Sequence, residues 1–141
     1  MTRVIDASVV IKWYVAESDS DAANTLLDAE AYFLAPDLLF SECASILAKL
    51  VRRGTLTQTR ALEIIAVIMD GPFTTATTAQ IADDALRISL STASVTPYDA
   101  SYVALAMLFN TTCVTADRRL VDSLRGTPAG DHVTLLADYV H

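Results

Sequence analysis

The sequence has few of the residues that mark several common classes of protein. Its two cysteines, Cys43 and Cys113, lie far apart and form no Cys-x-x-Cys motif. So few thiols suit a reducing compartment and argue against a disulfide framework or a zinc site. Glycine and proline number only 4 each, and 52% of the residues are hydrophobic. Such a composition excludes a disordered chain and supports a large buried core.

Positive charge is also scarce. The chain carries 10 Lys and Arg against 17 Asp and Glu, a formal net charge of −7. A protein that coats nucleic acid binds phosphates through Lys and Arg, so this class is disfavoured. A nuclease is not excluded, because carboxylates that hold a metal ion add to the negative charge while the ion restores positive charge locally.

Long apolar segments are missing as well. The longest one, 102–109, is too short to span a bilayer. Asp6 interrupts the N-terminus before an apolar signal-peptide region can form. We therefore expect a cytoplasmic protein with no membrane association. The length of 141 residues, without an internal repeat or linker, fits one domain over 1–141.

What the sequence does contain is an alternation of short apolar strands and longer helices with apolar residues at helical spacing. Strands are expected at 3–5, 32–35, 73–77, 112–115 and 132–136. Helices are expected at 7–15, from the polar segment 17–21 to about residue 30, from a cap at Asp37 to Gly54, and at 57–69, 78–90, 96–109 and 117–124. The alternation predicts a three-layer α/β/α fold with a short parallel sheet of about five strands.

Four acids occupy positions where such a fold places its chemistry. Asp6 and Asp117 follow short apolar strands, and therefore fall at strand carboxyl ends. Asp99 opens the most apolar helix, where an ionised group is costly unless it is paired or bound to a cation. Glu42 lies in the second turn of another apolar helix. Oxygen ligands without His or Cys suit Mg²⁺ or Mn²⁺, which activate water in phosphodiester hydrolysis.

Each acid also has a purely structural interpretation. Asp6 and Asp117 can cap the helices that follow them. Asp99 stands three residues after Thr96, the spacing of a capping box. Glu42 can be a solvated surface acid. Together the four favour an acidic metal-binding pocket.

The same residues make the sequence resemble the PIN domain family, in particular the VapC-like toxins of prokaryotic toxin–antitoxin pairs. The matching segments cover nearly the whole chain in order: Val4-Ile5-Asp6-Ala7-Ser8, Ser41-Glu42, Tyr98-Asp99-Ala100-Ser101-Tyr102-Val103-Ala104-Leu105-Ala106 and Thr115-Ala116-Asp117-Arg118-Arg119-Leu120. The resemblance implies a PIN-like fold and a Mg²⁺-dependent endoribonuclease, with Mn²⁺ as an alternative ion. It also implies an RNA substrate, a VapB-like antitoxin laid over the acidic groove, and a homodimer.

The resemblance further assigns roles to individual residues. Asp6 and Asp99 would be the main metal ligands, and Glu42 and Asp117 would complete the pocket and orient the attacking water. Ser8 and Thr115 match small hydroxyl positions beside these acids. Arg118 and Arg119, near the predicted pocket, can contact RNA phosphates or form exposed ion pairs. Asp122 is either a fifth acid of the pocket or part of a solvated helix face.

Other function classes share part of this pattern. A receiver-like phosphoacceptor domain also gathers acids and Mg²⁺ at strand ends, but it needs a lysine after the last strand and none follows Lys49. A haloacid-dehalogenase-type phosphatase would have an aspartate in place of Ser8. A catalytically silent interaction module, in which the acids only cap helices, remains the main alternative. It predicts that alanine at Asp6 or Asp99 lowers stability without affecting any metal-dependent activity.

Overall fold

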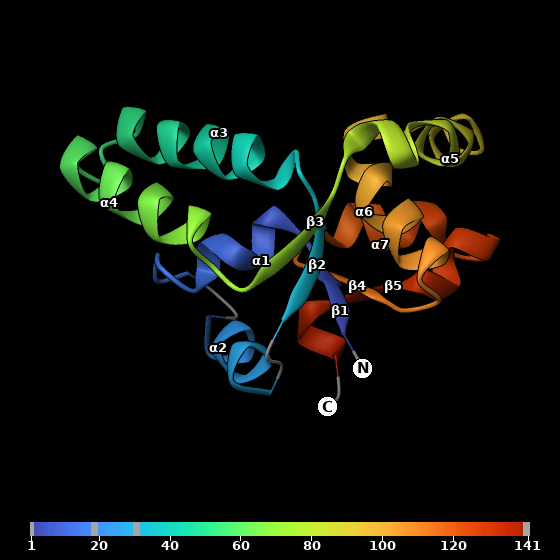
Figure 1. Ribbon diagram of the computed structural model, residues 1–141, viewed down its shortest axis with the longest axis horizontal. Helices are drawn as coiled ribbons and strands as arrows, with labels where there is room; N and C mark the ends of the chain where they lie inside the picture. Colours follow the sequence, from blue (N-terminus) through green and yellow to red (C-terminus); the bar gives the residue numbers. More distant parts are fainter. Residues whose placement is uncertain (1, 18–19, 30–31, 140–141) are drawn as a thin grey trace.

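A five-stranded parallel sheet forms the centre of the computed structural model, which describes residues 2–17, 20–29 and 32–139 (Figure 1). The strands are β1 (Arg3–Ile5), β2 (Phe33–Pro36), β3 (Phe73–Ala76), β4 (Cys113–Thr115) and β5 (Val133–Leu135). Their order in the sheet is β3-β2-β1-β4-β5, and every neighbouring pair is parallel. The predicted parallel sheet is confirmed.

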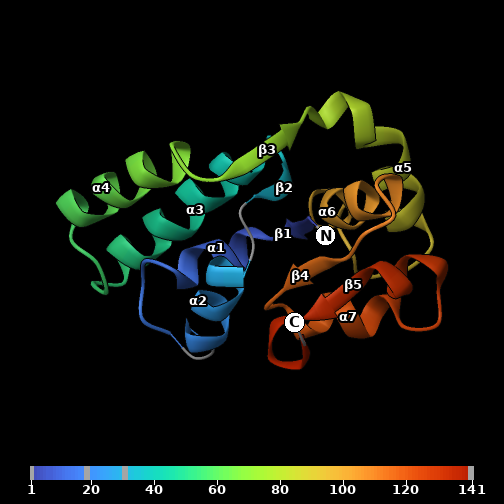
Figure 2. The same ribbon diagram turned by 60° about the horizontal axis from the view of Figure 1, so that its bottom comes forward.

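Helices cover both faces of this sheet. They are α1 (Ala7–Lys12), α2 (Ser20–Ala29), α3 (Leu39–Arg52), α4 (Gln58–Met69), α5 (Thr78–Leu90), α6 (Pro97–Leu108) and α7 (Arg118–Leu124), with short 3₁₀ helices η1 (Pro128–His132) and η2 (Leu136–Asp138). Helices α1 to α4 lie on one side and α5 to α7 on the other (Figures 1 and 2). This is the predicted three-layer architecture. In the described ranges no helix combines the length and apolar character needed to cross a membrane.

The strand order creates a switch point at the middle of the sheet. From β1 the chain moves outward through β2 to β3, and it then returns to the other side of β1 to form β4 and β5. The carboxyl ends of β1 and β4 therefore flank the position where an open α/β sheet binds its ligands. Val4 is level with Cys113, and the Asp6 N–H donates to the Val114 carbonyl at 3.1 Å. Asp6 is thus set directly beside the end of β4.

Helix α6 is the central element of the core. Its residues from Ala100 to Ala106 are all buried, and it packs against β1 and β2. Residues around most of its circumference are apolar, which explains why both the sheet and α5 can cover it. The predicted interior position of this helix is confirmed.

Three local predictions were wrong for reasons of tertiary contact. Helix α1 ends at Lys12 instead of residue 15, and Trp13 in the following turn donates its Nε1–H to the Ala23 carbonyl at 2.9 Å. Asp37 does not cap α3, whose N-cap is Leu38. Instead, Oδ1 of Asp37 accepts a hydrogen bond from the Thr78 N–H of α5. Residues 126–130, for which the sequence predicts no helix or strand, contain the start of η1, which is capped by the Thr127 side chain.

Candidate active site

Asp6 lies between β1 and α1 at the switch point and is only 8% exposed. Its Oδ2 accepts hydrogen bonds from the hydroxyls of Ser8 (2.9 Å) and Thr115 (2.6 Å). Asp6 is the N-cap residue of α1, as the cap interpretation predicts, but its side chain makes no capping hydrogen bond. The two hydroxyls next to Asp6 are those that the PIN resemblance indicated.

The same hydroxyls hold the segment that follows β4. The Ala116 N–H donates to Ser8 Oγ at 3.1 Å, and the Asp117 N–H donates to Thr115 Oγ1 at 3.1 Å. Each hydroxyl therefore donates to the Asp6 carboxylate and accepts from the backbone of the β4–α7 connection. The network fixes the position of Asp117 relative to Asp6.

Asp117 caps a helix and also lies near a positively charged side chain. Its Oδ1 caps α7 by accepting from the backbone N–H groups of Arg119 (3.0 Å) and Leu120 (3.3 Å). The cap interpretation is therefore confirmed for Asp117. Its Oδ2 lies 3.9 Å from the Arg119 guanidinium, so the carboxylate also faces a cationic group.

Asp99 lies in the first turn of α6, and its N–H donates to Thr96 Oγ1 at 3.2 Å. This bond is one half of the predicted capping box. Its Oδ2 is 4.0 Å from the Arg119 guanidinium. Burial and the Asp117 charge raise the pKa of the Asp99 carboxyl, while the Thr96 hydroxyl and Arg119 lower it.

Glu42 lies in the first turn of α3, because that helix begins at Leu39. It is half-buried, and its Oε1 has no hydrogen-bond partner in the described part of the chain. Burial, followed by the charges of Asp6 and Asp99, raises the pKa of Glu42 to about 7, and a contact with Tyr102 opposes the shift. The interpretation as a solvated surface acid is therefore wrong.

The four acids share one electrostatic environment. Burial raises the pKa of Asp6, the Thr115 and Ser8 hydroxyls lower it, and the Asp99 charge raises it further. Within 2–17, 20–29 and 32–139, however, no three His, Cys, Asp or Glu side chains are already arranged to hold a metal ion. Like charges repel unless a cation lies between them, so the carboxylates would have to draw together around an ion. The four-carboxylate metal centre stays a prediction.

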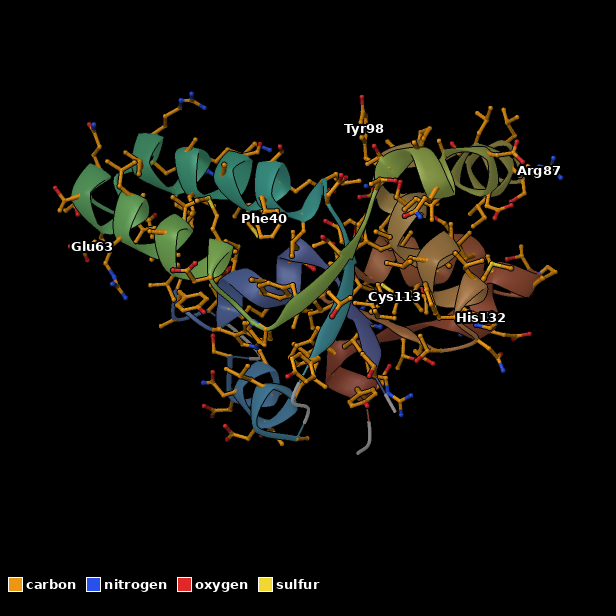
Figure 3. The ribbon with its side chains drawn as sticks, in the orientation of Figure 1. Phe40, Glu63, Arg87, Tyr98, Cys113 and His132 are labelled. Atoms are coloured by element: carbon orange, nitrogen blue, oxygen red, sulfur yellow. The ribbon has the colours of Figure 1, made fainter. Side chains whose placement is uncertain are left out.

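The other residues considered from the sequence lie outside this group. Arg118 is exposed and has no ion pair with a described residue. Asp122 pairs with Arg125 at 2.7 Å on an exposed face of α7, which confirms the solvated-face interpretation. Tyr98, beside Asp99 in sequence, points away from the body of the molecule (Figure 3).

Tyr102 is the residue that sequence reasoning missed. It was assigned no role of its own, although its spacing of three residues from Asp99 was a usable signal, because such residues share a helix face. The structure buries its side chain completely next to Glu42.

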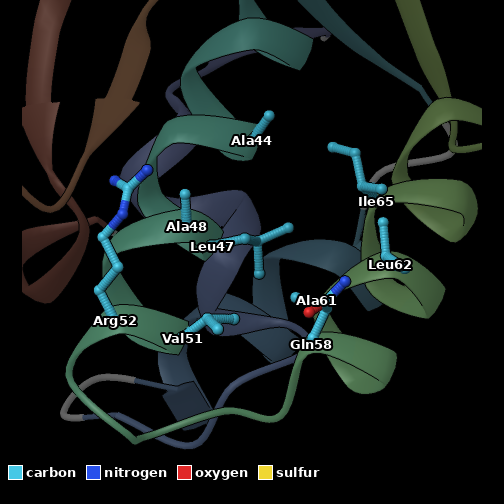
Figure 4. Close-up of a pocket in the computed structure, with 9 residues that line it drawn as sticks. All are labelled: Ala44, Leu47, Ala48, Val51, Arg52, Gln58, Ala61, Leu62 and Ile65. Atoms are coloured by element: carbon cyan, nitrogen blue, oxygen red, sulfur yellow. The ribbon is translucent and has the colours of Figure 1, made fainter.

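An apolar cavity lies apart from the acids. It lies between α3 and α4, has a volume of about 290 Å³, and is lined by Ala44, Leu47, Ala48, Val51, Arg52, Gln58, Ala61, Leu62 and Ile65 (Figure 4). None of these residues is acidic, so the cavity offers no ligands for a cation.

Comparison with known proteins identifies the family of the chain. The family model described as the PIN domain matches residues 3–123. The chain belongs to the PIN domain family. This PIN domain is 32% identical over 124 residues to Ribonuclease VapC3 of Pyrobaculum aerophilum, a match that covers 86% of the chain and 94% of the relative.

Solved structures share the PIN fold. The crystal structure of PAE2754 from Pyrobaculum aerophilum superposes with a TM-score of 0.70 at 20% identity, over 97% of this chain and 85% of that one. VapC20 of Mycobacterium tuberculosis, described as a sarcin-ricin loop cleaving toxin, gives 0.62 at 13% identity over 79% and 87%. A toxin–antitoxin complex from Klebsiella pneumoniae gives 0.59 at 15% identity over 96% and 98%. The five-stranded α/β architecture is therefore that of PIN-domain proteins.

Proposed function

We propose that this PIN domain is a divalent-cation-dependent endoribonuclease, the VapC-like toxin of a toxin–antitoxin pair. The observation that carries the proposal is the buried Asp6 carboxylate at the switch point of the sheet, held by two hydroxyl donors and accompanied by Glu42, Asp99 and Asp117. Asp6 occupies the N-cap position of α1, but helix capping does not account for its carboxylate, since the side chain makes no capping bond.

The donor set fits a hard cation. The side chains of Asp6, Glu42, Asp99 and Asp117 offer only carboxylate oxygens. Such ligands suit Mg²⁺ or Mn²⁺. Asp6 and Asp99 would hold the ion, and Glu42 and Asp117 would complete the site directly or through water. When bound, the ion supplies activation of water and stabilisation of negative charge on a phosphoryl oxygen.

The protein side chains contribute positioning and charge. Ser8 and Thr115 orient Asp6, because both hydroxyls donate to its carboxylate, and they oppose the larger effect of burial, which raises the pKa of Asp6. Glu42 and Asp117 would orient the attacking water. Arg119, which is 67% exposed beside Asp99 and Asp117, and Arg118 on the same turn of α7 would contact phosphates of the RNA.

RNA as the substrate is supported by the relatives. The curated relative is named a ribonuclease and one structural relative is described as cleaving the sarcin-ricin loop. Because the chain has a net charge of −7, it needs local positive groups such as Arg118 and Arg119 to bring RNA, a polyanion, to an acidic site. A cytoplasmic location without a membrane partner is proposed together with the RNA substrate.

A VapB-like antitoxin is the second proposed partner, supported by the description of the Klebsiella pneumoniae structure as a toxin–antitoxin complex. A helix or extended segment laid over the acidic groove would block RNA. It would have to bring Lys or Arg side chains, because burying four carboxylates without positive charge is unfavourable. We also propose a homodimer, since large apolar side chains such as Leu86 and Leu90 of α5 are exposed.

Cleavage of a pool of RNA by the purified protein with Mg²⁺ or Mn²⁺ tests the function. Asp6→Asn and Asp99→Asn should abolish metal-dependent cutting and keep the fold, whereas Asp83→Asn, which alters an exposed ion pair with Arg87, should cut normally. Absence of both RNA cleavage and metal binding would refute the nuclease and favour the catalytically silent interaction module. PIN family membership, together with the lack of a lysine after Lys49, sets the receiver-like alternative aside.

A further inference from the structure

Two buried side-chain oxygens in the described part of the chain have no hydrogen-bond partner, and both lie at the acidic pocket. They are Oε1 of Glu42 and the hydroxyl oxygen of Tyr102. Tyr102 is 0% exposed. Buried polar groups in folded proteins are nearly always hydrogen-bonded, so two unpaired oxygens at one site require a shared explanation.

A side-chain contact joins Tyr102 of α6 to Glu42 of α3. Tyr102 follows Asp99 by three residues, and the two side chains therefore share a helix face. Burial raises the pKa of Tyr102, and the charges of Asp6 and Glu42 raise it further. Conversely, the Tyr102 hydroxyl opposes the upward shift of the Glu42 pKa. The two groups are thus electrostatic neighbours, Tyr102 fully buried and Glu42 half-buried.

Packing alone does not explain the hydroxyl. The neighbouring residues of α6 are small or apolar, and Ala100, Val103 and Leu105 are buried with it. A phenylalanine would fill nearly the same space and leave no unpaired polar atom in the core. A hydroxyl at this position has a physical reason only if it binds something in the working state of the site.

We propose that Tyr102 is a positioning residue of the active site, whose hydroxyl donates a hydrogen bond to Oε1 of Glu42. The bond satisfies both unpaired oxygens and leaves the second Glu42 oxygen for the bound cation. Partners behind a metal ligand generally fix its orientation in this way. The inference rests on the proposed metal-dependent function, which it deepens by assigning a donor to Glu42.

The test is the affinity of the protein for Mn²⁺, followed by electron paramagnetic resonance in the absence of RNA. Tyr102→Phe keeps the ring and removes only the hydroxyl, and it should weaken Mn²⁺ binding by about 10–100-fold. Tyr139→Phe is the matched control. It removes a hydroxyl that accepts a hydrogen bond from Arg3 Nε at 2.7 Å, at the other end of β1, and should leave Mn²⁺ binding unchanged.

A double-mutant cycle with Glu42→Gln separates positioning from general damage to the fold. If Tyr102 acts through Glu42, Tyr102→Phe adds little further loss of Mn²⁺ affinity in the Glu42→Gln background. Fully additive losses, or equal Mn²⁺ affinities of Tyr102→Phe and the wild type, overturn the role of Tyr102 alone. A wild-type protein that binds no Mn²⁺ overturns the proposed function and this inference with it.

Discussion

At the scale of single residues, one hydroxyl connects two of the proposed ligands. Thr115 is fully buried, and its Oγ1 donates to Asp6 and accepts from the Asp117 N–H. Valine has nearly the same shape but can make neither bond. Of the two hydroxyls that donate to the Asp6 carboxylate, the one of Ser8 would then remain.

Thr115→Val should therefore lower the unfolding free energy by about 1–3 kcal/mol and weaken divalent-cation binding. Urea denaturation and Mn²⁺ titration measure the two effects. Thr111→Val is the matched control, because Thr111 is also buried but its hydroxyl donates to the Thr2 carbonyl at 2.8 Å. The control should lose stability without a change in Mn²⁺ affinity. Unaltered cation binding by Thr115→Val would argue against its role at the site.

The raised pKa of Glu42 predicts how the stability of the metal-free protein depends on pH. Burial raises its pKa from 4.5 to about 7, so between these values the folded state binds more protons than the unfolded state. Stability should therefore fall as the pH rises through this window. Burial also raises the pKa of Asp6 and of Asp99, which adds to the effect with the same sign.

Urea denaturation at a series of pH values, in the presence of a chelator, checks this dependence. Glu42→Gln cannot titrate at this position, and its unfolding free energy should fall less steeply between pH 4.5 and about 7. Parallel profiles for the wild type and Glu42→Gln would show that Glu42 titrates at an ordinary pKa.

At the scale of the element, α7 brings the positively charged Arg119 side chain to the acids. Asp117 caps the helix, and the cap places Arg119 in its first turn, 3.9–4.0 Å from Asp117 and Asp99. Arg119 is therefore an internal counter-ion at the position where a divalent cation would compete with it. Because the Arg119 side chain is 67% exposed, the ion pairs are weak and the side chain is free to turn toward a phosphate.

Arg119→Ala should have two effects of opposite sign. Loss of the competing charge should tighten Mn²⁺ binding by up to about fivefold, the value of an exposed ion pair, while RNA binding should weaken. Mn²⁺ titration and fluorescence anisotropy of labelled RNA in a chelator measure these affinities separately. Arg118→Ala, which removes the same charge from the same turn, should weaken RNA binding only. Weaker Mn²⁺ binding in Arg119→Ala would rule out the counter-ion role.

At the scale of the whole molecule, exposed apolar side chains lie on both sides of the sheet. Leu86 and Leu90 are 48% and 76% exposed on α5, and Leu62 is 61% exposed on α4, which lies at the opposite end of the molecule (Figure 1). Leu86 and Leu90 are four residues apart and therefore form a continuous apolar strip on α5. We assign the proposed dimer contact to this strip.

Sedimentation velocity should then show a dimer for the wild type and a monomer for Leu86→Glu/Leu90→Glu. Leu62→Glu is the control for an added charge on an exposed leucine, and it should remain dimeric. A dimer that persists in the double variant and is lost in Leu62→Glu would move the interface to α4. A monomeric wild type at all concentrations would exclude the homodimer.

The sequence alone was sufficient for the layers of the fold, and it also singled out the four acids on which the proposed site rests. Strands and helices were predictable because apolar spacing and caps are local signals, as Thr96 at the start of α6 shows. Asp6 was identifiable because it directly follows a short apolar strand, and parallel strands end at the same edge of a sheet.

Only the tertiary structure decided what each acid contacts. It separated Asp117, whose side chain makes capping hydrogen bonds, from Asp6, whose side chain makes none, and it paired Asp37 with α5 instead of α3. It also brought the Tyr102 hydroxyl beside Glu42. The contacts of Asp6 with Thr115, of Asp37 with Thr78 and of Glu42 with Tyr102 join residues far apart in the chain. Such contacts depend on how the elements pack, which no local pattern in the sequence encodes.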